Sequence, residues 1–234
     1  KYLVGIAGEL GAQSSDPALG WGVGSWGEST WGTARNASSS DVSLDNSSWS
    51  LSLWGEDLIA TVRNGAIYYW DTSAGTNNRA ALVSDIAGAE SVPTIARVTT
   101  VSFPDRHFIA GGCTSYSTGN VDDMLIRWSS QEQFEKFAPT ATNTAGDQRL
   151  QIGTKIVAMV SAREETLIST DSALYGMTFV GGNFVFSFRL LATDCGAAGL
   201  NTMIGIDGDV FWMGKRNFFR YDGIVKELPC PVQY

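Results

Sequence analysis

A pair of short strands joined by a turn recurs four times along this 234-residue chain. The first pair is predicted at residues 57–63 and 66–70 around Asn64-Gly65. Asn-Gly is the strongest two-residue hairpin signal, because both turn positions require a positive φ. The other three pairs fall at residues 106–111 with 124–129, 165–170 with 173–180, and 209–213 with 218–222.

Each pair is preceded by another apolar stretch, so that every unit holds three or four strands. The preceding stretches are residues 49–54, 99–103, 155–161 and 203–206. A repeat of about 40–60 residues with this content is typical of β-propeller blades. The chain is therefore predicted to be all-β, with antiparallel β-propeller-like repeats. An ordinary antiparallel β-sandwich is the alternative.

Composition agrees with a turn-rich β-protein. The chain has 26 Gly and 8 Trp, 44% of its residues are hydrophobic, and only 17% are charged. This apolar and aromatic content excludes intrinsic disorder, and the scarcity of Lys and Glu argues against long helices. One short helix of one or two turns is predicted at residues 130–137, with Ser129 or Ser130 as its cap.

The first 48 residues differ from the rest and form an irregular Gly/Trp-rich arm. A Trp-Gly pair occurs at Trp21, Trp26 and Trp31, with a spacing of five that matches neither a strand nor a helix. The three rings are candidates for a subunit interface; the alternative is that they cap the core of their own domain. Residues 49–234 form the propeller-like domain, and we expect the chain to be a fragment of a longer protein.

Charge and rare residue types limit the possible partners and cofactors. The formal net charge is −8, so the chain lacks the basic surface of a tight nucleic-acid binder. With one His and three separated Cys, no His/Cys metal site is predicted, and no cofactor is expected. No apolar run approaches the roughly 18 residues of a membrane-spanning helix.

No catalytic constellation is visible in the sequence, so the chain is predicted not to be an enzyme. The lone histidine, His107, lies within a predicted strand and is interpreted as structural. G-x-S-x-G and phosphate-binding loops are absent. A hydrolase could use a pair of carboxylates, and Asp122, Asp123 and Asp209 are the candidates. Asp207-Gly208-Asp209 is interpreted as a turn rather than a calcium loop.

Several segments resemble structural tail proteins of tailed bacteriophages, in particular the tail nozzle, or packaged-DNA stabilisation, proteins of short-tailed phages. The resemblance extends over most of residues 20–230 and rests on phrases of sequence. These are WSLSLWGEDLIAT (49–61), IYYWD (67–71), MLIRWSSQE (124–132), PTATNTAGDQRL (139–150), ALYGMTFVG (173–181) and FWMGK (211–215). Nozzle proteins of this kind are usually much longer than this chain.

The resemblance implies a β-propeller-bearing virion protein that is assembled in the host cytoplasm. It implies a homo-oligomeric ring, typically a hexamer, that forms the DNA exit channel next to a portal adaptor, fibre or needle. Genomic double-stranded DNA would pass through such a ring without tight binding, which fits a net charge of −8. A carbohydrate-binding propeller, receptor-binding or lectin-like, is the alternative function because Trp rings can stack on sugars.

Overall fold

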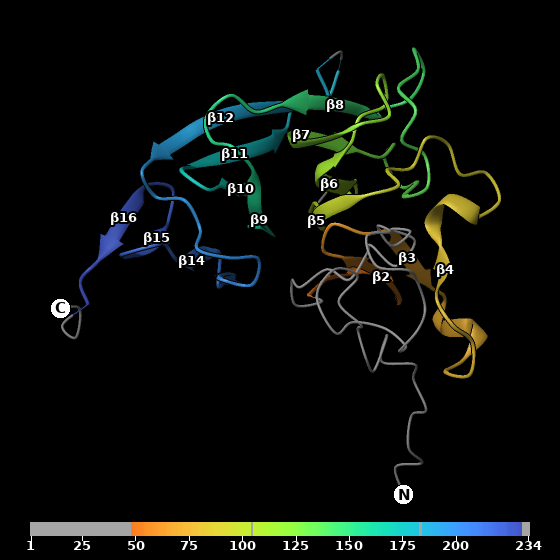
Figure 1. Ribbon diagram of the computed structural model, residues 1–234, viewed down its shortest axis with the longest axis horizontal. Helices are drawn as coiled ribbons and strands as arrows, with labels where there is room; N and C mark the ends of the chain where they lie inside the picture. The colour runs from red at the N-terminus through yellow and green to blue at the C-terminus, as the bar shows by residue number, and fades with distance from the viewer. Residues whose placement is uncertain (1–47, 104, 183, 231–234) are drawn as a thin grey trace, which may run out of the picture. The chain divides into compact units, whose positions relative to one another are not determined.

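The computed structural model describes residues 48–103, 105–182 and 184–230 (Figure 1). The chain divides into two compact units, Lys1–Asn46 and Ser47–Tyr234. The first unit lies outside the described residues, and so do the predicted interface residues Trp21, Trp26 and Trp31. All described residues lie in the second unit.

The described residues form sixteen strands in four antiparallel sheets of four strands each. Sheet 1 holds β1 (Trp49–Trp54), β2 (Asp57–Val62), β3 (Ile67–Trp70) and β4 (Ala81–Leu82). Sheet 2 holds β5 (Ala96–Val101), β6 (Phe108–Thr114), β7 (Val121–Trp128) and β8 (Gly146–Arg149). Sheet 3 holds β9 (Ile156–Ser161), β10 (Thr166–Thr170), β11 (Ala173–Phe179) and β12 (Phe186–Thr193). Sheet 4 holds β13 (Met203–Ile206), β14 (Asp209–Met213), β15 (Phe218–Tyr221) and β16 (Val225–Leu228).

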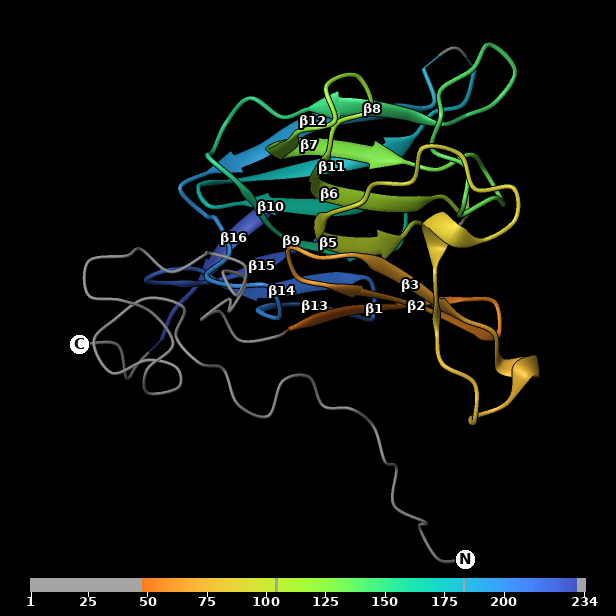
Figure 2. The same cartoon turned by 45° about the vertical axis from the view of Figure 1, so that its right-hand side comes forward.

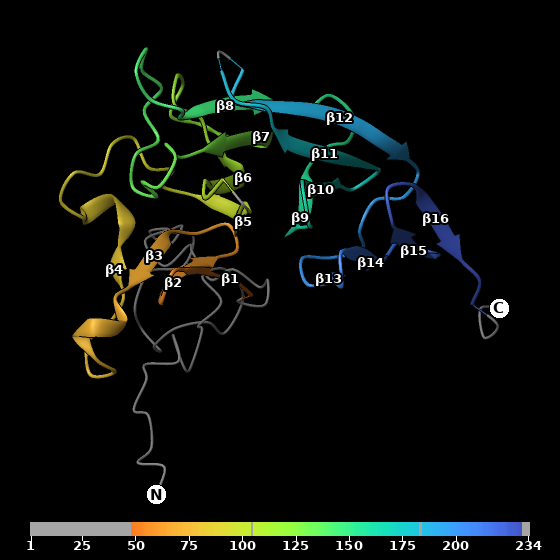
Figure 3. The same cartoon turned by 180° about the vertical axis from the view of Figure 1, so that it is seen from behind.

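Every sheet is a simple meander in which each strand pairs with the next along the chain. The first strands lie side by side, with contacts between β1 and β5, β5 and β9, and β9 and β13. Figures 1 and 3 show these strands toward the middle of the unit and β4, β8, β12 and β16 toward its outside. Repeated four-stranded meanders with neighbouring first strands define a β-propeller-like architecture. The predicted fold class is confirmed, and the four separate sheets do not form a two-sheet sandwich.

Three clusters of buried apolar side chains hold neighbouring sheets together. The first joins sheets 1 and 2, the second joins sheets 2 and 3, and the third joins sheets 3 and 4. Consecutive residues of β6 alternate between the first two clusters: Phe108 and Ala110 face sheet 1, and Ile109 faces sheet 3. Each large side chain buried in this way contributes about 1.5–3 kcal/mol. In Figure 2 the strands of sheets 2 and 3 overlap in the upper part of the unit, and those of sheets 1 and 4 overlap below them.

The predicted first hairpin is present, but its turn differs from the expected one. Asn64 has a φ of 55°, whereas Gly65 is not among the residues with positive φ. The Gly65 amide donates to the Val62 carbonyl at 2.9 Å, and the Val62 amide donates to Ala66 at 3.3 Å. The loop is therefore longer than two residues, and only the Asn position needs the left-handed conformation.

The helix predicted at residues 130–137 is wrong. This segment forms two successive tight turns, in which Gln133 donates to Ser130 and Lys136 donates to Gln133. Glu132 has a φ of 60°, which a right-handed helix excludes. The irregular path lets Phe137 become fully buried between sheets 1 and 2, so packing overrides the local helix signal. The only helices in the described residues are two short 3-10 turns, η1 (Thr72–Ala74) and η2 (Val83–Asp85).

Candidate functional site: the outward faces of the end sheets

The outward face of sheet 1, the face turned away from sheet 2, is almost wholly apolar. Along β1, Ser50 and Trp54 are buried toward sheet 2, while Leu51 and Leu53 are 64% and 65% exposed. Strand register places their cross-strand partners on the same face. The outward face consists of Trp49, Leu51, Leu53, Leu58, Ala60, Val62, Tyr68 and Trp70. The rings of Trp49 and Tyr68 lie 6.2 Å apart, centroid to centroid.

The outward face of sheet 4, turned away from sheet 3, is also rich in apolar side chains. Val210, Trp212 and Phe219 belong to the buried cluster shared with sheet 3. Their neighbours along the strands must point the other way because side chains alternate. This outward face consists of Ile204, Ile206, Asp209, Phe211, Met213, Phe218, Arg220, Lys226 and Leu228. Ile204 is 57% exposed, and Arg220 lies over the Phe211 ring at 5.9 Å from its centroid.

The two middle sheets show what such faces look like when they are covered. All seven residues of β6 and all five of β10 are buried. In β2 and β14, the corresponding second strands of the end sheets, only alternate residues are buried. Among the described residues, no buried apolar cluster joins sheet 4 to sheet 1. Adjacent exposed apolar residues in this number mark an interaction surface.

Sequence reasoning identified the strands of these faces but not their exposure. The alternation in residues 49–54 predicts a half-buried strand, and that prediction is confirmed. The buried side, however, carries Ser50 and Ser52 beside Trp54, whereas the exposed side carries Trp49, Leu51 and Leu53. Exposed leucines beside buried serines on one strand are the signal of an uncovered sheet face. This signal is not visible in the sequence, because it depends on which neighbouring sheet each face meets.

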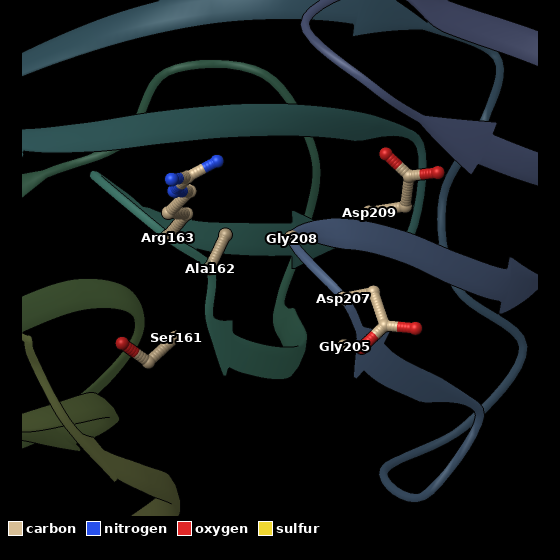
Figure 4. Close-up of a pocket in the computed structure, with 7 residues that line it drawn as sticks. All are labelled: Ser161, Ala162, Arg163, Gly205, Asp207, Gly208 and Asp209. Atoms are coloured by element: carbon tan, nitrogen blue, oxygen red, sulfur yellow. The ribbon is translucent and has the colours of Figure 1, made fainter.

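A shallow hollow lies where the β9–β10 turn meets the β13–β14 turn. Its volume is about 430 Å³, and its lining includes Arg163 from one turn and Asp207 and Asp209 from the other (Figure 4). Asp207 and Gly208 both have positive φ, as a tight hairpin turn requires, which agrees with the predicted turn. Asp209 is held by Arg220 at 2.6 and 2.9 Å. The hollow presents no uncommitted carboxylate pair for hydrolysis.

The three carboxylates proposed for a hydrolase do not share one site: Asp122 and Asp123 line a hollow of about 620 Å³, and Asp209 lies outside it. Asp122 and Asp123 belong to sheet 2, and Asp209 belongs to sheet 4. Each is paired with an arginine of its own sheet: Asp122 with Arg149 at 2.8 Å, Asp123 with Arg97, and Asp209 with Arg220. Each carboxylate is thus committed to an arginine partner.

His107 is fully buried and hydrogen-bonded at both ring nitrogens. Its Nδ1 lies 2.8 Å from an Asp105 carboxylate oxygen, and its Nε2 lies 3.0 Å from the Thr144 hydroxyl. This order resembles a nucleophile–base–carboxylate triad. The Thr144 hydroxyl, however, already accepts the Gln131 amide at 2.8 Å, and the imidazole packs against Phe186. The cluster ties the 131–144 loop to sheet 2, which favours the structural interpretation of His107.

The cysteines and acidic residues offer no metal centre within the described ranges. No group of three or more His, Cys, Asp or Glu side chains there could hold a metal ion. Cys113 and Cys195 are buried free thiols. Burial raises the pKa of Cys113 to about 12 and that of Cys195 to about 11, so both remain protonated and unreactive at neutral pH.

The tryptophans that the structure describes serve mainly the core. Trp54, Trp128 and Trp212 are buried in the three clusters between sheets. Trp54 also carries the Arg106 guanidinium over its ring at 5.0 Å. Trp49 is 45% exposed, on the outward face of sheet 1. Sugar binding by ring stacking needs exposed aromatic rings at equivalent positions in each of the four sheets. The described tryptophans do not occupy such positions.

Comparisons with known proteins give only distant similarities. No protein-family model matches the chain, and no curated protein matches it. Among solved structures, it is similar to the computationally designed Ika4 protein, with 15% identity over 79% of this chain and 92% of that one and a TM-score of 0.38. It is also similar to a candidate gluconolactonase, with 11% identity over 76% of this chain and 61% of that one and a TM-score of 0.43.

The designed Ika8 protein is a third similar structure, with 14% identity over 80% of this chain and a TM-score of 0.35. This chain spans 47% of the length of Ika8. Similarities at this level carry no argument about activity. In the part of the chain that the structure describes, no helix has both the length and the apolar character needed to cross a membrane.

Proposed function

We propose that this chain is a structural protein of a bacteriophage tail, which assembles with further copies into a ring or nozzle around the DNA exit channel. The observation that carries the proposal is the pair of apolar outward faces on sheets 1 and 4. Leu51, Leu53, Ile204 and Ile206 are each about half exposed or more, which favours burial against other protein surfaces.

A role without catalysis belongs to the same proposal. The candidate carboxylates are engaged by arginines, and His107 and Thr144 are committed to structural hydrogen bonds. The net charge of −8 supports a conduit, because an acidic chain gains little from releasing counterions from DNA. Location in the virion and contact with a portal adaptor, fibre or needle come from the sequence resemblance.

The test is the mass and form of the purified full chain. Light scattering across a concentration series should give a defined oligomer, and electron microscopy should show rings with a central channel. Heterologous contacts that close on themselves produce such rings. A particle that stays at the 25.1 kDa of one chain at every concentration would contradict the proposal.

A further inference from the structure

We infer that the outward face of sheet 4 in one copy packs against the outward face of sheet 1 in a second copy, so that two copies complete one eight-sheet propeller. The inference concerns the contact between two copies and goes beyond the proposed tail function. The occupant of each face is thus a second copy of this chain.

The two faces are the opposite halves of an interface that the fold already uses three times. Sheet 1 packs on sheet 2, sheet 2 on sheet 3, and sheet 3 on sheet 4, always through the same two sides of a sheet. The face of sheet 1 that no described sheet covers corresponds to the face of sheet 2 that packs on sheet 1. The face of sheet 4 that no described sheet covers corresponds to the face of sheet 3 that packs on sheet 4. A second copy therefore continues the same stacking at either end.

The side chains on these faces suit that contact. In the covered interfaces the first strands supply medium-sized apolar residues such as Val98 and Ile156. On the uncovered faces, β1 supplies Leu51 and Leu53, and β13 supplies Ile204 and Ile206. The outward face of sheet 4 carries three charged side chains, Asp209, Arg220 and Lys226. Arg220 is paired with Asp209 and Asp222, and Lys226 is paired with Asp222. These side chains therefore enter the contact with their charges compensated.

The number of sheets is also compatible with two copies. Propellers usually have four to eight blades, and two copies with four sheets each reach the upper end of that range. A closed pair of this kind makes the contact twice, from sheet 4 of each copy to sheet 1 of the other. The contact is heterologous, since the two surfaces that meet are different.

The first experiment places a charge on one face at a time in the full chain. We expect wild type to have twice the 25.1 kDa mass of one chain, or a multiple of that pair. Leu51→Asp and Ile204→Asp should each reduce it to single chains, because either change removes both contacts of a pair. Ile224→Asp is the matched control: Ile224 is 68% exposed but lies in the β15–β16 turn, away from both faces.

Mixing the two variants tests which faces meet. Leu51→Asp chains keep an intact sheet 4, and Ile204→Asp chains keep an intact sheet 1, so the mixture should form a pair that neither variant forms alone. If sheet 1 meets sheet 1, Ile204→Asp stays paired alone, and mixing does not rescue Leu51→Asp. If the same chain covers its own face, neither variant changes the mass. Either result overturns the inference.

The same measurements separate this inference from the proposed function. Rings whose mass is unaffected by Leu51→Asp and Ile204→Asp would overturn the inference, and the tail role would then depend on other surfaces of the chain. Pairs that respond as expected but never form a larger particle would support the inference and contradict the ring. Circular dichroism of each variant confirms that single chains remain folded.

Discussion

At the scale of single residues, Arg127 is the buried charge that organises the second sheet. Its side chain is 2% exposed and donates to the carbonyl oxygens of Thr114, Ser91 and Phe137. The guanidinium also lies over the Phe137 ring at 5.6 Å from its centroid. Desolvation lowers its pKa, so the hydrogen bonds must compensate for the loss of water.

Replacement of Arg127 by Met should lower the free energy of unfolding by about 2–4 kcal/mol, because several buried carbonyl groups lose a charged donor. Urea denaturation measures the change. Arg149→Met is the control, since Arg149 is 61% exposed and its ion pair with Asp122 is solvent-screened. Equal effects of the two substitutions would contradict the role assigned to Arg127.

Asp105 makes stability sensitive to acid. Burial alone would raise the pKa of this carboxyl, but hydrogen bonds from His107 and Ser102 outweigh it and hold the pKa below its usual value. A carboxyl with a lowered pKa stabilises the fold above its ordinary pKa of about 4 and loses that contribution as pH falls further. The melting temperature should therefore decrease as the pH is lowered below about 4.

Asp105→Asn should make that drop shallower, because the protonation step at residue 105 disappears. Melting curves from pH 7 to pH 2.5 measure the slope. Some acid sensitivity should remain, since hydrogen bonds donated by Thr154 also hold the pKa of Asp171 low against the opposing effect of burial. Asp85→Asn, at an exposed position in η2, serves as the control. An unchanged slope in Asp105→Asn would argue against this coupling.

At the scale of elements, the link between sheets 3 and 4 depends on a close backbone approach at Gly196. A Cβ there would lie 2.5 Å from the Asp171 carbonyl oxygen and from the Ser172 nitrogen, both in the β10–β11 turn. The adjacent Ala197 amide donates to the Ser169 hydroxyl at 2.8 Å. This glycine is required by space rather than by φ, because backbone atoms cannot move aside as a flexible side chain can.

Gly196→Ala should cost about 1–3 kcal/mol or more of stability, as expected for overpacking against a fixed backbone. Gly199→Ala is the matched control, because a Cβ at Gly199 would meet only the Thr202 methyl group at 3.5 Å. Thermal unfolding of both variants measures the difference. If the two alanines behave alike, the turn moves freely and the close approach is not what joins these sheets.

At the scale of the whole molecule, the net charge of −8 argues against a grip on DNA. We expect no retardation of double-stranded DNA in a gel assay at about 50 mM salt, a condition under which proteins that contact many phosphates bind strongly. A basic DNA-binding protein in the same assay serves as the positive control and shows that this DNA can form a retarded complex. A salt-dependent complex with this chain would contradict the conduit mechanism.

The repeat of strand pairs could be predicted from local sequence patterns. Turn signals and alternating apolar residues placed the middle hairpins of all four sheets and the first strand of each, because these are local properties of strands and turns. The fourth strands, such as β4 and β8, carry weaker patterns and were not placed individually. Local preference also misplaced residues 130–137, where burial of Phe137 and the positive φ of Glu132 decided the path.

Which apolar face of a sheet is buried depends on the packing of neighbouring sheets. Leu51 and Leu167 are both leucines at alternating strand positions, yet the first is 64% exposed and the second fully buried. The difference lies in the neighbour: sheet 3 has a sheet on each side, whereas the described residues place a sheet on only one side of sheet 1. Hydrophobic burial depends on contacts between segments far apart in the chain, and no local pattern contains that information.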